Sequence, residues 1–202
     1  MRRRGRIWPA NTHLTGFVLQ DAGGEQATAA AADEFLEAGE PPVVFTPGSA
    51  TTGQQRFFVE SVKACRMAGL RGMLVTNFPE QLPADLPPSV RGFKYLPFSR
   101  ILPRCAALVY HGGIGTMAQA IKAGIPHLVV PNAHDQPDNA LRIERLGLGQ
   151  TIYPERYRAA RVARSLKAII RSDEVRQNCK RYPAEIDSAA SLRRACELIE
   201  SL

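Results

Sequence analysis

The sequence lacks the features that mark membrane-spanning and secreted proteins. It contains no apolar run of about eighteen residues, the length that a membrane-spanning helix requires, so no membrane span is expected. The basic start of the chain, residues 1–13, has no apolar core behind it, which does not fit a signal peptide. The four cysteines are scattered without metal-ligand spacing, which is typical of reduced, packed thiols and predicts a cytoplasmic protein; they are Cys65, Cys105, Cys179 and Cys196.

Aromatic residues make up only 7% of the chain and are not interleaved with the basic residues, although the formal net charge is +7. A surface for single-stranded nucleic acid needs aromatic side chains between its basic ones. Much of the basic charge instead lies in residues 2–6 and in the helical tail, residues 156–194, where a solvated helix face is the usual explanation. The sequence therefore predicts no nucleic-acid partner.

Apolar residues make up 45% of the 202 residues, which is enough for one domain with a sizeable core. Strand-like and helix-like segments alternate along the chain. This alternation predicts an α/β fold with a doubly wound parallel sheet and helices on both faces. Residues 1–25 have the character of a linker, and residues 26–202 form the predicted domain.

The predicted elements are short and regularly spaced. Ser99 is placed as the N-cap of the third helix, and a proline-rich loop is expected at residues 79–88. The predicted strands are residues 43–46, 72–76, 92–95, 107–110, 128–130 and 149–152. The predicted helices are residues 27–38, 54–68, 99–104, 117–123, 136–146 and 158–170, with one or two more in residues 173–202.

A glycine-rich turn follows the fourth predicted strand. Residues 111–116 read His-Gly-Gly-Ile-Gly-Thr and lead into the helix predicted at residues 117–123. The N-terminus of a helix presents unpaired N–H groups and the positive end of the helix dipole, which favour phosphate. The glycines let the backbone approach such an anion closely, and His111 and Thr116 add side-chain donors.

Three polar residues, Ser49, His111 and Asp135, each fall just after a predicted strand. Ligands of parallel α/β sheets bind at the carboxyl ends of the strands, where these residues would meet. Their shared position is the best purely physical argument for a single binding site.

Two nucleotide motifs compete with this interpretation. Gly113, Gly115 and Ala118 fit the dinucleotide fingerprint G-x-G-x-x-A, and an acid, Asp135, lies about twenty residues further on. That fingerprint normally occupies the first strand–helix turn, whereas here it follows at least three predicted strands, so NAD(P) binding is a remote alternative. Residues 48–53 have the glycine spacing of a P-loop but are followed by Gln-Gln in place of Lys-Ser/Thr, so ATP hydrolysis is not expected.

The segments HGGIGT, AGIPHLVVP and DQPDNA, at residues 111–116, 123–131 and 135–140, resemble the donor-sugar box of the UDP-glycosyltransferase family. This family has the two-domain fold called GT-B and includes macrolide, sterol and plant natural-product glycosyltransferases. Weaker similarity extends the resemblance over almost the whole chain. Two departures are Phe98, where family members often have histidine or glutamine, and Tyr95, where the plant box often has tryptophan.

The resemblance implies a role for each residue of the site. Tyr95 and Leu96 would line the uracil pocket. Asp135 and Gln136 would bind sugar hydroxyls, with Asn139 nearby. The implied contacts to the diphosphate come from Ser49, His111, Gly113, Gly115 and Thr116.

The resemblance also implies the activity. The chain is expected to be the donor-binding half of an inverting glycosyltransferase that moves a hexose from UDP to a small or lipid-like acceptor. No metal is expected, because the chain has no Asp-x-Asp motif, and no cofactor is expected besides the UDP-sugar substrate. The family's general base lies in a preceding acceptor-binding domain, so no catalytic residue is assigned to this chain. A stand-alone or non-catalytic donor-binding subunit that needs a separate acceptor-binding partner is the alternative.

Overall fold

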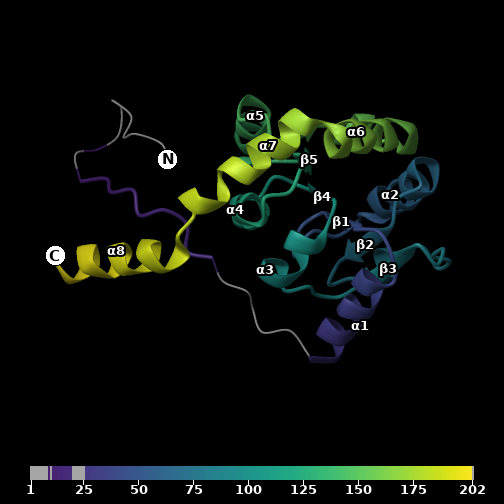
Figure 1. Cartoon of the computed structure of the whole chain (residues 1–202), viewed down its shortest axis with the longest axis horizontal. Helices are drawn as coiled ribbons and strands as arrows, with labels where there is room; N and C mark the ends of the chain where they lie inside the picture. The colour runs from purple at the N-terminus through teal and green to yellow at the C-terminus, as the bar shows by residue number, and fades with distance from the viewer. Residues whose placement is uncertain (1–8, 10, 20–25, 202) are drawn as a thin grey trace.

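A six-stranded parallel sheet forms the centre of the computed structural model, which describes residue 9, residues 11–19 and residues 26–201 (Figure 1). The strands are ordered β3-β2-β1-β4-β5-β6, which is the doubly wound order, in which the direction of strand addition across the sheet reverses between β1 and β4. The predicted fold class is therefore confirmed. The strands are β1 (Val43–Thr46), β2 (Gly72–Val75), β3 (Val90–Phe93), β4 (Ala107–Tyr110), β5 (His127–Val129) and β6 (Gly149–Thr151).

Helices cover both faces of the sheet. On one face, α2 and α6 pack over a core that contains Phe45, Leu74 and Val109. On the other face, the core around Val44 and Tyr110 is covered by the remaining helices, except α8. The helices are α1 (Gln26–Glu37), α2 (Gln55–Ala68), α3 (Phe98–Ile101), α4 (Ile114–Ala123), α5 (Gln136–Arg145), α6 (Ala159–Arg171), α7 (Asp173–Arg181) and α8 (Ser188–Glu200), and the short 3-10 turns are η1 (Pro79–Gln81), η2 (Leu102–Arg104), η3 (Pro154–Arg156) and η4 (Pro183–Glu185).

The inner strands β1, β2, β4 and β5 are buried along their whole length. This is why the sequence shows them as short continuous apolar runs and not as alternating ones. Three of the four cysteines are also buried, and burial raises the pKa of Cys65, Cys105 and Cys179 to about 12. Cys196, on α8, is exposed.

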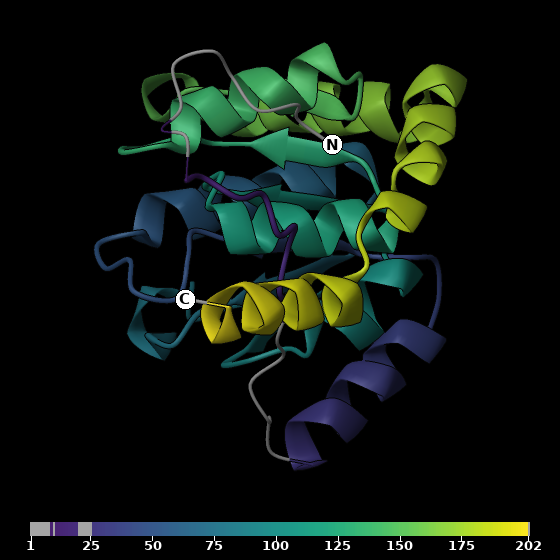
Figure 2. The same ribbon diagram turned by 90° about the vertical axis from the view of Figure 1, so that its left-hand side faces the viewer.

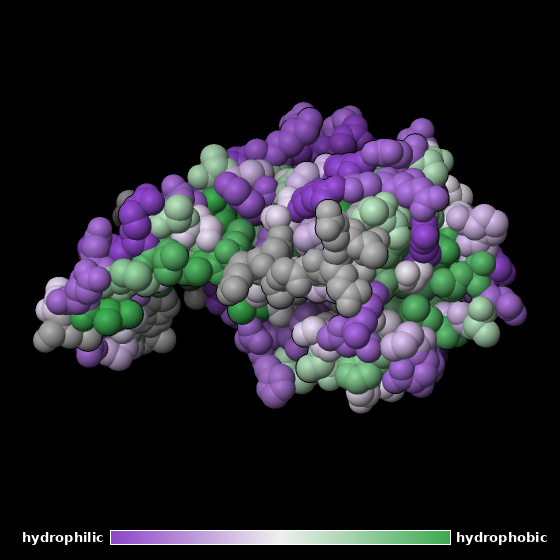
Figure 3. Space-filling view, turned by 90° about the horizontal axis from the view of Figure 1, so that it is seen from below, coloured by the Kyte–Doolittle hydropathy of each residue, from purple (hydrophilic) through white to green (hydrophobic). Residues whose placement is uncertain are grey.

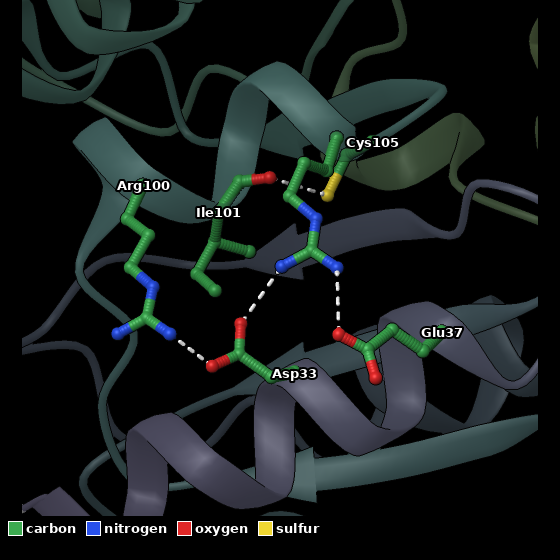
Figure 4. A network of polar contacts seen from close by, with 6 residues as sticks. Asp33, Glu37, Arg100, Ile101 and Cys105 are labelled. Carbon is green, nitrogen blue, oxygen red and sulfur yellow. Dashed lines mark hydrogen bonds and ion pairs between the residues drawn. The ribbon is translucent and has the colours of Figure 1, made fainter.

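Helix α1 is fixed beside α3 by a network of ion pairs (Figure 4). Asp33 accepts hydrogen bonds from Arg100 and, at 2.8 Å, from Arg104, whose guanidinium also lies 3.7 Å from Glu37. Exposed ion pairs of this kind contribute about 0–1 kcal/mol each. Most of the stabilisation of α1 therefore comes from its apolar side, where Phe35 is 6% exposed.

Helix α8 projects from the body of the molecule, and the end of the segment at residues 11–19 reaches its first turn (Figures 1 and 2). The backbone N–H of Leu19 donates to Ser188 Oγ at 2.8 Å, and this hydroxyl donates to Leu19 O at 3.3 Å. Figure 3 shows α8 as an arm beside the main body. The boundary predicted between residues 25 and 26 stays a prediction, although the described residues before α1 contain no helix or strand.

Most element bounds differ from the predicted ones by a residue, and the differences are largest at β3, α3 and α4. Strand β3 begins at Val90, two residues earlier than predicted, because it pairs with β2 from Gly72 onward. Ser99 is not an N-cap; α3 already begins at Phe98, since Pro97 O accepts from the backbone N–H groups of residues 100 and 101. Helix α4 begins three residues earlier than predicted, and its N-cap is a glycine.

Candidate functional site

A cavity of about 660 Å³ opens at the carboxyl ends of the strands, beside the point where the strand order reverses. Loops that leave β1 and β4 in opposite directions create a crevice at this position in doubly wound sheets. Seven of the ten predicted site residues line the cavity. They are Ser49, Tyr95, Leu96, His111, Gly113, Gly115 and Thr116.

Helix α4 points its N-terminus at this cavity. Its N-cap is Gly113, which offers no side chain, and the N–H of Met117 makes the first helical bond, to Gly113 O at 2.9 Å. The N–H groups of Ile114, Gly115 and Thr116 therefore have no partner within the helix, and the three residues line the cavity. Together with the dipole, these donors form a binding site for an anion.

The three glycines of the turn differ in what an added side chain would meet. Gly112 has φ +90°, and a Cβ there would lie 3.0 Å from Val129 Cγ1, so backbone conformation and packing both demand glycine. A Cβ on Gly113 would overlap the His111 ring. At Gly115 an added Cβ would meet nothing within 4 Å, so this is the one glycine of the three beside which the structure has open space.

The His111 ring lies between the glycine turn and the loop after β1. A Cβ on Gly48, which has φ +105°, would lie 3.2 Å from His111 Nε2. Burial lowers the pKa of His111, and the nearby Asp135 carboxylate partly opposes this by raising it. The ring is therefore neutral at pH 7 and can donate one hydrogen bond. Nδ1 is buried with no partner among the described residues, so Nε2 is the nitrogen that can reach a ligand.

The loop that carries Ser49 is held in place from the neighbouring strand connection. Asn77 Nδ2 donates to Ser49 O at 3.0 Å. Gln81, only 2% exposed, accepts from the N–H of Gln54 at 2.6 Å and donates to Thr51 O at 3.3 Å. These bonds fix the backbone and leave the Ser49 side chain exposed at the cavity. A donor held in this way loses little entropy on binding.

Tyr95 and Leu96 follow β3 and form another wall of the cavity. Leu96 is 2% exposed and belongs to the hydrophobic core, whereas Tyr95 is partly exposed. Burial of Leu96 therefore anchors this stretch of chain and keeps the Tyr95 ring at the cavity wall.

The predicted sugar-binding residues lie outside the lining of the cavity. Asn139 is 5% exposed, and its Nδ2 donates to Gly112 O at 2.9 Å and to Asp135 Oδ2 at 2.8 Å. Gln136 Oε1 accepts from the N–H groups of Asn132 and Ala133 at 2.8 and 3.1 Å. Gln136 thus fixes the loop after β5 to the start of α5, and Asn139 fixes α5 to the glycine turn. Asp135 is exposed, and sugar binding by these residues stays a prediction.

Sequence reasoning missed several residues of the site. Thr76 and Asn77 follow β2, Lys94 follows β3, and all three line the cavity. Their position just after a strand is the signal that could have identified them. Lys94 is the one charged residue among the described residues of the lining, which contains no carboxylate. The cavity is therefore suited to an anionic ligand.

His111 also borders a second, smaller cavity of about 190 Å³ on its other side, where Arg56 and Asn132 line the wall. Among the described residues there is no group of three or more His, Cys, Asp or Glu side chains that could hold a metal ion. In the same part of the chain, no helix is both long and apolar enough to cross a membrane.

Solved structures of glycosyltransferases share this fold. The calicheamicin glycosyltransferase CalG4 superposes with a TM-score of 0.72 at 23% identity, over 80% of this chain and 42% of that protein. Glycosyltransferase VinC, solved in complex with DTDP, gives a TM-score of 0.67 at 25% identity, over 83% and 43%. The fold is thus the Rossmann-like domain of a GT-B glycosyltransferase.

The sequence identifies the family. The profile of the "Erythromycin biosynthesis protein CIII-like, C-terminal domain" family matches residues 70–200, and the chain belongs to this family. It is 32% identical over 197 residues to O-mycaminosyltylonolide 6-deoxyallosyltransferase of Streptomyces fradiae, which covers 96% of this chain and 46% of that relative. The chain thus spans less than half the length of this curated relative.

Proposed function

We propose that this chain binds the donor of an inverting, metal-independent glycosyltransferase, and that the donor is a pyrimidine nucleoside diphosphate sugar. The observation that carries the proposal is the cavity without carboxylates at the strand-order reversal, into which α4 directs its unpaired N–H groups. A diphosphate has the charge and size that these donors match. The resemblance of the sequence favours UDP, and the complex of VinC with DTDP makes thymidine diphosphate the first competitor.

The proposed reaction is a single displacement at the anomeric carbon. An acceptor hydroxyl attacks opposite the diphosphate, the new C–O bond forms, and the bond to the β-phosphate oxygen breaks. The nucleoside diphosphate leaves with its added negative charge, and the α4 amides, neutral His111 and Lys94 stabilise that charge without a metal. The hydroxyl proton passes to a general base on an acceptor-binding domain or subunit.

This base is assigned outside the chain because His111, the only histidine that lines the cavity among the described residues, is committed to the diphosphate. We therefore expect the purified chain to bind donor but to transfer no sugar until an acceptor-binding partner is added. A small or lipid-like acceptor is part of the proposal. Turnover by the chain alone, measured as release of nucleoside diphosphate, would contradict this division of roles.

Calorimetric titration with UDP, TDP, GDP and NAD tests the nucleotide class. UDP and TDP should bind, and excess EDTA should leave their affinity unchanged. NAD should not bind, because the fingerprint glycines follow β4, whereas the first strand–helix turn of the sheet lies after β1. Tighter binding of NAD than of either pyrimidine diphosphate would reverse the proposal.

A further inference from the structure

Ion pairs with carboxylates are present on α1, α3, α5, α7 and α8 of the described chain. These pairs offset part of the positive charge on the faces that the five helices present to solvent. They are Arg91–Glu34, Arg100–Asp33, Arg104–Asp33, Arg142–Asp138, Arg176–Asp173 and Arg194–Glu197. The outer faces of α2 and α6 depart from this pattern.

Seven cations lie on the outward sides of α2 and α6, and we call this surface the basic face. On each helix they are spaced so that they lie opposite the buried apolar residues. The two helices contain a single carboxylate, Glu60, whose side chain is 16% exposed. The basic face consists of Arg56, Lys63 and Arg66 on α2 and Arg161, Arg164, Lys167 and Arg171 on α6.

The two helices run side by side and in the same direction, so their cations form one surface (Figure 1). The N–H of Ala159, at the start of α6, donates to Glu60 Oε2 at 2.6 Å. Near the other end, Lys167 Nζ donates to Met67 O at 3.4 Å. Glu60 is therefore occupied by α6 and by Lys63, at 3.5 Å, and leaves most of the positive charge unopposed.

Repulsion within this concentration of charge opposes folding, because the cations lie within a Debye length of about 8–10 Å. The gains that offset it are local: Arg66 and Arg171 lie in the last turns of their helices, where the dipole favours cations, and Lys167 donates to Met67 O. A dense patch of arginine is, however, well suited to phosphate groups, because the guanidinium binds phosphate oxygens in pairs. The basic face is therefore suited to a polyanionic partner that carries phosphate groups.

Exposed apolar side chains lie at both ends of the basic face. Met67, at the end of α2, is 56% exposed. At the start of α6, a hollow of about 220 Å³ is lined by Arg156 and Arg161 with Glu144, and also by Tyr153 and Leu141, which are 50% and 42% exposed. Cations flanked by exposed apolar groups are the pattern of surfaces that lie on a lipid bilayer.

We propose that the basic face docks this chain on an anionic phospholipid bilayer, with the arginines at the phosphates and Tyr153, Leu141 and Met67 in the interfacial layer. A nucleic acid supplies the phosphates but offers no apolar layer to the exposed side chains of Met67, Leu141 and Tyr153. None of the seven cations lines the nucleotide-binding cavity, and only Arg56 borders the smaller cavity on the other side of His111.

Flotation of the full chain with vesicles tests the proposal. Wild type should bind vesicles of equimolar phosphatidylglycerol and phosphatidylcholine, should not bind phosphatidylcholine alone, and should be released by added salt. The variant R56Q/R161Q/R164Q should partition on the order of 100-fold less strongly, at roughly one kcal/mol for each cation near the membrane surface. The variant R142Q/R176Q/R194Q removes the same net charge from other faces and should keep wild-type binding.

A second variant, M67S/Y153S, keeps every cation and should still lose vesicle binding; it also serves if the arginine variant fails to fold, as judged by circular dichroism. Equal affinity for neutral and anionic vesicles, or equal losses in the two arginine variants, would overturn the proposal. Binding to a DNA duplex that exceeds vesicle binding at the same ionic strength, and that M67S/Y153S leaves unchanged, would replace the bilayer by nucleic acid.

Discussion

Replacing Gly115 by alanine separates the ligand-binding role of the glycine turn from its role in packing. Gly115 lies in the first turn of α4, and an added Cβ would meet no atom within 4 Å. The protein itself therefore has room for the methyl group. Alanine also has the higher helix propensity, by up to about 1 kcal/mol. We expect the free energy of unfolding of Gly115→Ala to be equal to or greater than that of wild type.

Ligand binding should change in the opposite direction. The methyl group would project into the space where a diphosphate must approach the α4 amides. Intrusion of one methyl group into a close-packed contact costs roughly 1–3 kcal/mol, which corresponds to a loss of about 5- to 150-fold in UDP affinity. Calorimetric titration with UDP and urea unfolding of the same preparation measure the two effects.

Gly112→Ala is the matched control for this experiment. It lies in the same turn, but its φ of +90° and the 3.0 Å approach to Val129 Cγ1 predict a loss of stability. If Gly115→Ala instead binds UDP as wild type does, the diphosphate does not lie against α4. If Gly115→Ala unfolds more easily than wild type, the prediction that the protein has room for a methyl group at this position is wrong, and the glycine is required for packing.

Three further predictions concern side chains. His111→Ala should weaken UDP binding by about 1.5–3 kcal/mol, the range for a hydrogen bond to a charged group, and an unchanged affinity would make His111 structural. Asp135→Ala should weaken binding of UDP-glucose and leave UDP nearly unaffected, because a carboxylate is repelled by the diphosphate; equal losses for both ligands would refute the sugar contact. Burial lowers the pKa of His127 from 6.5 to about 3. Below about pH 6.5 the folded state therefore takes up fewer protons than the unfolded state. The free energy of unfolding has its full value above that pH and falls by up to about 1.4 kcal/mol per pH unit towards pH 3. Urea unfolding between pH 7 and pH 5 should show this fall in wild type and a smaller one in His127→Gln, and equal slopes would exclude His127 as its source.

The comparison of sequence and structure is clearest at the sugar-binding residues. Asp135, Gln136 and Asn139 belong to one motif, and nothing in the sequence separates their roles. In the structure, Gln136 and Asn139 are bound to backbone groups of the loop after β5 and of the glycine turn, while Asp135 is exposed. We therefore expect Asp135→Ala to report on a sugar contact more directly than changes at the two amides do. Urea unfolding of this variant measures the separate cost of losing its hydrogen bond to Asn139.

The sequence by itself determined the local features of this protein. Buried strands such as β1 and β4 are continuous apolar runs, and the glycines indicate a helix after the turn, because both features depend only on neighbouring residues. The start of that helix at Ile114, three residues before the predicted one, comes from the structure. Tertiary structure alone decided which strands pair. That order places β1 beside β4, so that Ser49 and His111 face one cavity although they lie 62 positions apart in the sequence. Packing between distant segments also added Lys94 to the cavity and joined α2 to α6, and periodicity along the chain carries no information on such contacts.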